Sequence, residues 1–157
     1  MSISFRPAGQ TDEPFLLRVY GSTRTAELSV LPWTPAQVEA FLKMQLDAQH
    51  LHYQTQYPDA AHDIILFEDQ PVGRLYVARL EKEIRIVDIA LLTEARGRGI
   101  GTSIIKDLMD EAAREGKPLT IYVENFSPSL HLFERLGFSK VGEHNFYLLM
   151  QWQQQKS

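Results

Sequence analysis

Apolar and polar residues alternate at the start of the chain and then recur at helical spacing. Ile3 to Arg6 alternates, which is typical of a short half-buried strand, and Thr11-Asp12-Glu13-Pro14 supplies a helix cap with acidic residues in the first turn. Thr34-Pro35-Ala36-Gln37 is a second helix start, with a capping threonine, an early proline and a glutamine that can close a capping box. Apolar residues then recur at helical spacing and predict one long amphipathic helix that ends near Tyr57-Pro58.

From residue 62 onward the spacing of apolar residues becomes that of strands. Short polar turns separate three runs rich in Ile, Val, Leu and Tyr, which predicts an antiparallel meander. The runs are Asp63 to Phe67, Val72 to Leu80 and Ile84 to Leu92. A helical stripe of apolar residues then runs from Ile104 to Ala112, and Gly116 followed by Pro118 ends the predicted helix.

The last third of the chain predicts a strand, a helix and two closing strands. The strand is Leu119 to Val123, and the helix begins at Ser127-Pro128 and reaches Gly137, which suits a left-handed cap. The closing strands run from about Lys140 to Glu143 and from Phe146 to Trp152.

Length and composition limit the number of domains that these elements can form. A chain of 157 residues with 44% hydrophobic content fits one globular domain, which we expect to span residues 1–157. The elements, in the order βααβββαβαββ, predict an α/β (α+β) fold in which helices flank a mixed, mainly antiparallel sheet of about seven strands.

Charge and residue usage exclude several functions. The formal net charge is −4 and the basic residues are spread along the chain, so we expect no nucleic-acid partner. No apolar run approaches the roughly 20 residues that span a bilayer, and the start lacks the pattern of a secretion signal. We therefore expect a cytoplasmic protein with no membrane partner. The absence of cysteine excludes thiolate zinc sites and a cysteine acyl-enzyme, and the five histidines show no ligand spacing, so we expect no metal.

The chemistry-bearing feature is the loop Arg96-Gly97-Arg98-Gly99-Ile100-Gly101, which lies between an apolar strand and an amphipathic helix. Unpaired backbone N–H groups and the positive end of the helix dipole favour a phosphate or pyrophosphate there, and the glycines let it approach without a Cβ in the way. The two arginines can add charge-assisted contacts. A mononucleotide P-loop is excluded because Gly101-Thr102-Ser103 lacks the lysine, and a dinucleotide loop because the spacing is GxGxG and follows a meander.

The loop pattern RxxGxG resembles the pyrophosphate-binding loop of the Gcn5-related N-acetyltransferase (GNAT) superfamily. Ile89 to Gly101 is similar to the fourth strand and loop of that family, and Phe133-Glu134-Arg135-Leu136-Gly137-Phe138 is similar to its later YxxxGF signature with one change. The predicted order of elements is also the order found in the family, and the resemblance is strongest from Ile84 to Phe138. It implies a GNAT-like acyl-CoA N-acyltransferase fold, acetyl-CoA as co-substrate and a small-molecule or peptide amine as acceptor.

The resemblance also implies which residues bind the cofactor. The backbone at the end of the fourth strand would hold the pantetheine arm, and an N–H there would polarise the thioester carbonyl. The residues implied to bind acetyl-CoA are Ile89, Ala90, Leu91, Arg96, Gly97, Arg98, Gly99, Ile100, Gly101, Thr102, Ser127 and Phe133. Ser127 has a second explanation, since capping of the following helix accounts for it fully.

The catalytic residues are less well defined by the resemblance. The family often places a tyrosine where Phe133 stands, as the acid for the departing thiolate, and a phenyl ring cannot give up a proton. Tyr122 and Tyr147 are candidate replacements, beside unaided departure of the thiolate and a purely structural role for each tyrosine. Asp88, the one acid inside an apolar run, is a candidate general base, with solvent exposure or pairing with an arginine as the alternative.

The segment between the first two helices commonly shapes the acceptor pocket in this family. Arg24, Glu27 and Trp33 are therefore candidate substrate contacts, with surface or core placement as the alternative for each. Glu27 is also a weaker candidate base. The identity of the acceptor and the oligomeric state stay open, with a homodimer as one option. Two other functions remain open as well: a coenzyme A-binding regulatory module without catalysis, and transfer of a different acyl group or to a hydroxyl.

Overall fold

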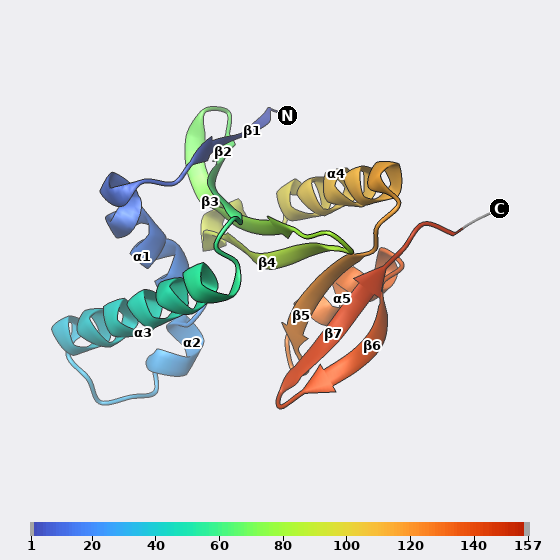
Figure 1. The fold of residues 1–157 in the computed structure, drawn as a ribbon. Helices are drawn as coiled ribbons and strands as arrows, with labels where there is room; N and C mark the ends of the chain where they lie inside the picture. The colour runs from blue at the N-terminus through green and yellow to red at the C-terminus, as the bar shows by residue number, and fades with distance from the viewer. Residues whose placement is uncertain (1, 156–157) are drawn as a thin grey trace. The chain divides into compact units, whose positions relative to one another are not determined.

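The computed structural model describes residues 2–155, and Figure 1 shows their strands and helices. Hydrogen bonding links seven strands into a sheet of order β1-β2-β3-β4-β5-β7-β6. The strands are β1 (Ile3–Pro7), β2 (Ala61–Phe67), β3 (Gln70–Arg79), β4 (Ile84–Leu91), β5 (Leu119–Glu124), β6 (Ser139–His144) and β7 (Tyr147–Trp152). The helices are α1 (Glu13–Ser22), α2 (Thr25–Leu28), α3 (Pro35–Gln56), α4 (Ile100–Glu115) and α5 (Ser129–Arg135), with 3₁₀ turns at Gln10–Asp12 (η1) and Thr93–Ala95 (η2).

The chain divides into two compact units. The first comprises Met1–Tyr76 and Ile89–Arg98, and the second comprises Val77–Asp88 and Gly99–Ser157. The first unit therefore holds β1, β2, α1 to α3, the start of β3 and the end of β4. The second holds the rest of β3 and β4 together with every element from α4 onward.

In the first unit, β1 and β2 pair antiparallel and α1 packs against α3. The start of α3 follows from its sequence: the Thr34 hydroxyl accepts a hydrogen bond from the Gln37 N–H at 3.2 Å, and the Gln37 side chain accepts one from the Thr34 N–H at 2.9 Å. A buried cluster of Tyr20, Leu42 and Leu46 forms the core between the helices.

In the second unit, β4 and β5 are parallel, whereas β5 with β7 and β6 with β7 are antiparallel. The helix α4 lies against β5 and buries a stripe that begins at Ile100 and ends at Ala112. It ends at Gly116, whose φ of 67° is the left-handed conformation that glycine adopts without strain. The predicted mixed, mainly antiparallel sheet of seven strands is thus confirmed, as is this helix end.

The order of elements differs from the prediction in one place. A further short helix, α2, follows α1, so that three helices rather than two separate β1 from β2. Four residues are too few to show a helical period in the sequence, which is why the pattern did not indicate it. The first helix also begins later than its predicted cap, because Gln10–Asp12 forms a 3₁₀ turn before it.

Candidate functional site

The glycine-rich loop crosses from the first unit to the second and enters α4. Gly97 has φ of 76° and Gly99 has φ of 80°, and a Cβ added to either would meet nothing within 4 Å. Gly99 occupies the N-cap of α4, no side chain caps that end, and the first turn contains no acidic residue. The first N–H groups of α4 are therefore left for another partner, and the positive end of the helix dipole is not neutralised.

The remaining loop residues have distinct local roles. The Arg96 Nε donates a hydrogen bond of 3.2 Å to the carbonyl oxygen of Leu91, which ties the loop to the end of β4. The side chain of Ile100 is buried, Arg98 is exposed, and Gly101 and Thr102 lie in the first turn of α4. The loop is thus anchored at Arg96 and Ile100 and open at its glycines.

The two central parallel strands stop pairing before either strand ends. Among the described residues, the register joins Ile84–Ile86 to Leu119–Ile121, although β4 continues to Leu91 and β5 to Glu124. Ile89, Ala90 and Leu91 are half-buried. At the end of β4, the Leu92 N–H donates to the Val72 carbonyl at 2.8 Å.

Ser127 and Phe133 have structural roles within the second unit. The Ser127 hydroxyl accepts a hydrogen bond from the Ser129 N–H at 3.2 Å, so it satisfies a donor in the first turn of α5. Phe133 is buried and meets Phe138 edge to face, with ring centroids 5.2 Å apart. The predicted contacts of both residues with coenzyme A stay predictions.

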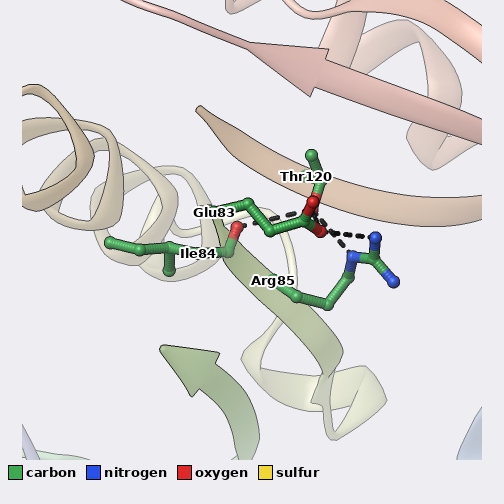
Figure 2. A network of polar contacts seen from close by, with 4 residues as sticks. All are labelled: Glu83, Ile84, Arg85 and Thr120. Atoms are coloured by element: carbon green, nitrogen blue, oxygen red, sulfur yellow. Dashed lines mark hydrogen bonds and ion pairs between the residues drawn. The ribbon is translucent and has the colours of Figure 1, made fainter. Parts of the chain in front are cut away.

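A polar network that the sequence analysis did not identify joins β4 to β5 (Figure 2). The Arg85 Nε donates to the Thr120 hydroxyl at 2.7 Å and its Nη2 donates to Glu83 Oε1 at 2.5 Å. The Thr120 hydroxyl donates to the same Glu83 oxygen at 2.9 Å. The Arg85 guanidinium also lies over the Tyr122 ring, 4.8 Å from its centroid. The Arg85 guanidinium thus covers one face of the Tyr122 ring, next to Ile121, the last residue of β5 that pairs with β4.

Tyr122 and Tyr147 lie on neighbouring antiparallel strands. In the register of β5 with β7, Tyr122 is opposite Leu149 and Glu124 is opposite Tyr147. Opposed residues share a face of the sheet and alternate residues return to it, so Tyr122, Glu124 and Tyr147 belong to one face. Glu124 was missed in the sequence; its position two residues after Tyr122 in a strand is the signal that could have found it.

The candidate substrate residues lie in the first unit. Arg24 is half-buried with its guanidinium 4.4 Å from the centroid of the Tyr20 ring. Trp33 meets Phe41 edge to face at 5.0 Å, and Glu27 is exposed on α2. The first contact joins the start of α2 to α1, and the second joins the segment after α2 to α3. Contact of these residues with an acceptor stays a prediction.

Asp88 lies in β4 and is half-buried. Its role as a general base stays a prediction. Within residues 2–155, no three histidine, cysteine, aspartate or glutamate side chains gather as metal ligands would. The helices in this part of the chain include none with the length and apolar character needed to cross a membrane.

The comparisons with known proteins agree with this architecture. The family model described as "Acetyltransferase (GNAT) family" matches residues 25–138, which is more than half of the chain. Among curated proteins, no sequence matches this chain significantly.

Solved structures share the fold over nearly the full length. PaiA N-acetyltransferase from Thermoplasma acidophilum, in complex with coenzyme A, has a TM-score of 0.69 at 15% identity and covers 98% of this chain and 100% of its own. An acetyltransferase from Thermus thermophilus has a TM-score of 0.69 at 17% identity, with 98% of both chains covered. The ribosomal-protein-S18-alanine N-acetyltransferase from Escherichia coli has a TM-score of 0.63 at 14% identity and covers 97% of this chain and 94% of its own.

The seven-stranded mixed sheet and the glycine loop before α4 define an α/β protein with the fold of these solved structures. Because the family model covers most of the sequence, the chain belongs to the acetyltransferase (GNAT) family.

Proposed function

We propose that this protein is an acetyl-CoA-dependent N-acetyltransferase that passes the acetyl group directly to an amine. The observation that supports the proposal most strongly is the backbone of the loop before α4. Gly97 and Gly99 adopt left-handed conformations with open space beside them, and the N-terminus of α4 has no side-chain cap. Such a cradle of N–H groups suits a pyrophosphate, which coenzyme A carries.

The proposal assigns a role to each cofactor-binding residue. The amides from Gly97 to Thr102 would hold the pyrophosphate, with Arg98 exposed beside them and Arg96 fixing the loop to Leu91. The half-buried end of β4, Ile89 to Leu91, would present backbone groups to the pantetheine arm. Since the register of β4 with β5 ends at Ile86, backbone groups of β4 beyond that point can serve such an extended ligand.

The transfer needs a neutral amine, a polarised carbonyl and a proton for the departing thiolate. The amine nitrogen forms a bond to the carbonyl carbon, the carbon–sulfur bond breaks, and the thiolate takes a proton while the amine loses one. A backbone N–H at the end of β4 would polarise the carbonyl. Tyr122 is our preferred proton donor because it follows Ile121, the last residue of β5 that pairs with β4, with Tyr147 second, and Asp88 is the proposed base.

Two measurements test the proposal. Calorimetric titration should detect binding of coenzyme A, and thiol release from acetyl-CoA should depend on the amine when a panel of amines is supplied. The panel would contain alkylamines, polyamines, amino acids and a short peptide with a free N-terminus. Absence of coenzyme A binding would overturn the proposal entirely.

A coenzyme A-binding module without catalysis is the second candidate, and Phe133 is the observation that favours it. This residue stands where relatives often carry an acidic tyrosine, and its ring is buried against Phe138. Tight binding of coenzyme A without amine-dependent thiol release would favour this candidate. A faster reaction with another thioester, or with a hydroxyl acceptor, would instead change the acyl group or acceptor in the proposal.

A further inference from the structure

One face of the β5–β7 ladder carries two tyrosines around a carboxylate. Glu124 and Tyr147 are directly opposed in the register, and Tyr122 precedes Glu124 by two residues on the same strand. Directly opposed residues in antiparallel strands have Cβ atoms about 4.5–5.5 Å apart. The Glu124 side chain is therefore within reach of the Tyr147 ring, and Tyr122 shares its face of the sheet. We call Tyr122, Glu124 and Tyr147 the Glu124 surface.

The carboxylate of this surface differs from its acidic neighbours. Glu83 is paired with Arg85, Glu111 with Arg79, and Glu143 with Lys140. The Glu124 side chain is half-buried, and among residues 2–155 it has neither a hydrogen bond nor an ion pair. A partly desolvated carboxylate without an internal partner is stabilised by a cation from outside.

The rings beside Glu124 are unusually accessible for aromatic side chains in a sheet. Tyr122 is 43% exposed and Tyr147 is 42% exposed. Phe126 follows β5 and Phe146 precedes β7 at the same end of the ladder, and their side chains are 68% and 70% exposed. The Asn125 N–H donates to the Phe146 carbonyl at 2.8 Å, which joins the two segments that carry these phenylalanines. Four exposed aromatic side chains thus lie at the end of the ladder where Glu124 stands.

We propose that the Glu124 surface binds a primary ammonium group, and that Phe126 and Phe146 contact the hydrocarbon that carries it. Aromatic faces attract cations, and a carboxylate on the same face of the sheet adds charge complementarity. Arg85 does not oppose this charge, because its guanidinium is already paired with Glu83 beneath the Tyr122 ring. The inference rests on the proposed function, since it assigns this cation as the amine acceptor before it loses its proton.

The site can be tested without catalysis by a cation that cannot be acetylated on nitrogen. Choline would be titrated into the cofactor-free full-length protein, with its neutral isostere 3,3-dimethylbutan-1-ol in parallel, and the tyrosine ring resonances followed by NMR. Choline should bind at least about fivefold more tightly than the neutral isostere, because only the cation gains from the carboxylate and the rings. Equal affinity for the two probes would overturn the inference.

Three variants define which side chains bind the probe. Glu124→Gln removes the charge at constant shape, and Tyr147→Leu removes a ring; each should weaken choline binding by roughly fivefold or more. Glu143→Gln is the matched control. His144 is opposite Tyr147 in the register of β6 with β7, so the adjacent residue Glu143 faces the other side of the sheet from Tyr147. If Tyr147→Leu fails to fold, Glu124→Gln alone decides. Unchanged choline affinity in Glu124→Gln would overturn the inference.

The source of the ammonium group is decided by transfer assays with hexylamine and with a short peptide that has a free N-terminus. The acceptor whose KM rises in Glu124→Gln, while coenzyme A affinity is unchanged, is the one that this surface binds. If neither KM rises, the surface does not bind the acceptor, although the proposed activity stands.

The role assigned to the phenylalanines has its own test. If the protein dimerises and Phe146→Ser abolishes the dimer without changing choline affinity or the KM of either amine, the phenylalanines form an interface between copies and their assigned role is wrong. Failure of coenzyme A binding would instead overturn the proposed function and leave the choline result intact.

Discussion

The Arg85 guanidinium lies 4.8 Å from the centroid of the Tyr122 ring, and Thr120 and Glu83 hold it there. The Thr120 hydroxyl is the centre of this arrangement, since it accepts from Arg85 and donates to Glu83. Its side chain is almost fully buried. Buried donors and acceptors that lose a partner keep their desolvation cost.

Thr120→Val tests the importance of that hydroxyl. The variant keeps the shape of the side chain but leaves the Arg85 Nε without this acceptor, so the free energy of unfolding should fall by about 1–3 kcal/mol. Urea denaturation measures the change. Thr55→Val is the matched control, because the Thr55 hydroxyl bonds to the Leu51 carbonyl on the exposed side of α3 and its loss should cost much less. Equal effects in the two variants would show that the network contributes little.

The two ends of α4 permit a controlled test of the loop. Gly99 and Gly116 both have positive φ, and both would place an added Cβ in open space. An alanine at either position should therefore cost a similar backbone strain of about 1–2 kcal/mol. Only Gly99 lies at the end proposed to bind the pyrophosphate, so Gly99→Ala should weaken coenzyme A binding by about tenfold or more. Calorimetry that finds the same affinity in Gly99→Ala and Gly116→Ala would contradict the placement of the cofactor.

The proposed proton donor can be distinguished from its neighbour by removing single hydroxyl groups. Tyr122→Phe keeps the ring and removes the acid, so kcat for thiol release should fall by about 100-fold while the KM of the amine changes little. Tyr147→Phe makes the same chemical change on the opposite strand, and we expect the smaller loss there. A larger loss of kcat in Tyr147→Phe would assign the proton to Tyr147, and no loss in either would show that neither tyrosine is the donor.

The strands and most helix ends were predictable because their signals are local. The Thr34–Gln37 capping box and the left-handed glycines at 116 and 137 are set by a few adjacent residues, and the structure confirms each of them. The helix α2 was not predictable, because four residues carry no periodic pattern. The loop before α4 was recognisable for the same local reason as the caps.

The side-chain relationships among β4, β5 and β7 were harder to predict because they depend on strand register. Arg85 meets Tyr122 only because β4 and β5 pair in parallel with Arg85 opposite Thr120. Glu124 is opposite Tyr147 only through the register of β5 with β7. Pairings between strands far apart in sequence are not encoded in the alternation of either strand alone, so these contacts appear only in the folded chain.

The close approach of β3 to the end of β4 provides a further test. A Cβ on Gly73 would overlap the Ala90 carbonyl oxygen and lie 2.9 Å from the Leu91 side chain. Gly73→Ala should therefore displace the end of β4 and lower the free energy of unfolding by about 1–3 kcal/mol. Thermal unfolding measures the loss of stability, and coenzyme A titration reports the displacement of the end of β4. Gly9→Ala is the control because a Cβ there meets nothing within 4 Å. Wild-type stability and affinity in Gly73→Ala would show that β4 accommodates the methyl group.

The carboxylate of Asp12 gives the first unit a stability that depends on acid pH. Arg6 donates hydrogen bonds of 2.9 and 2.8 Å to its two oxygens, and the Gly9 N–H donates a third at 2.8 Å. These contacts, with that of Arg6 the largest, lower the pKa of Asp12 from 3.8 to about 2. Because the folded pKa is below the unfolded one, the ionised carboxylate stabilises the fold fully above pH 3.8, and this stabilisation is lost as the pH falls through about 2.

Asp12→Asn should therefore lower the free energy of unfolding at pH 7 by about 1–2 kcal/mol, less than the full linkage value because the Arg6 side chain is half exposed. Denaturation at pH 7, 4 and 2 measures the difference from the wild-type protein. It should be largest at pH 7, remain substantial at pH 4 and shrink at pH 2, where protonation removes much of the charge that the variant lacks. A difference that stays constant down to pH 2 would show that Asp12 stabilises the turn through hydrogen-bond geometry, since asparagine then fails for a reason other than its charge.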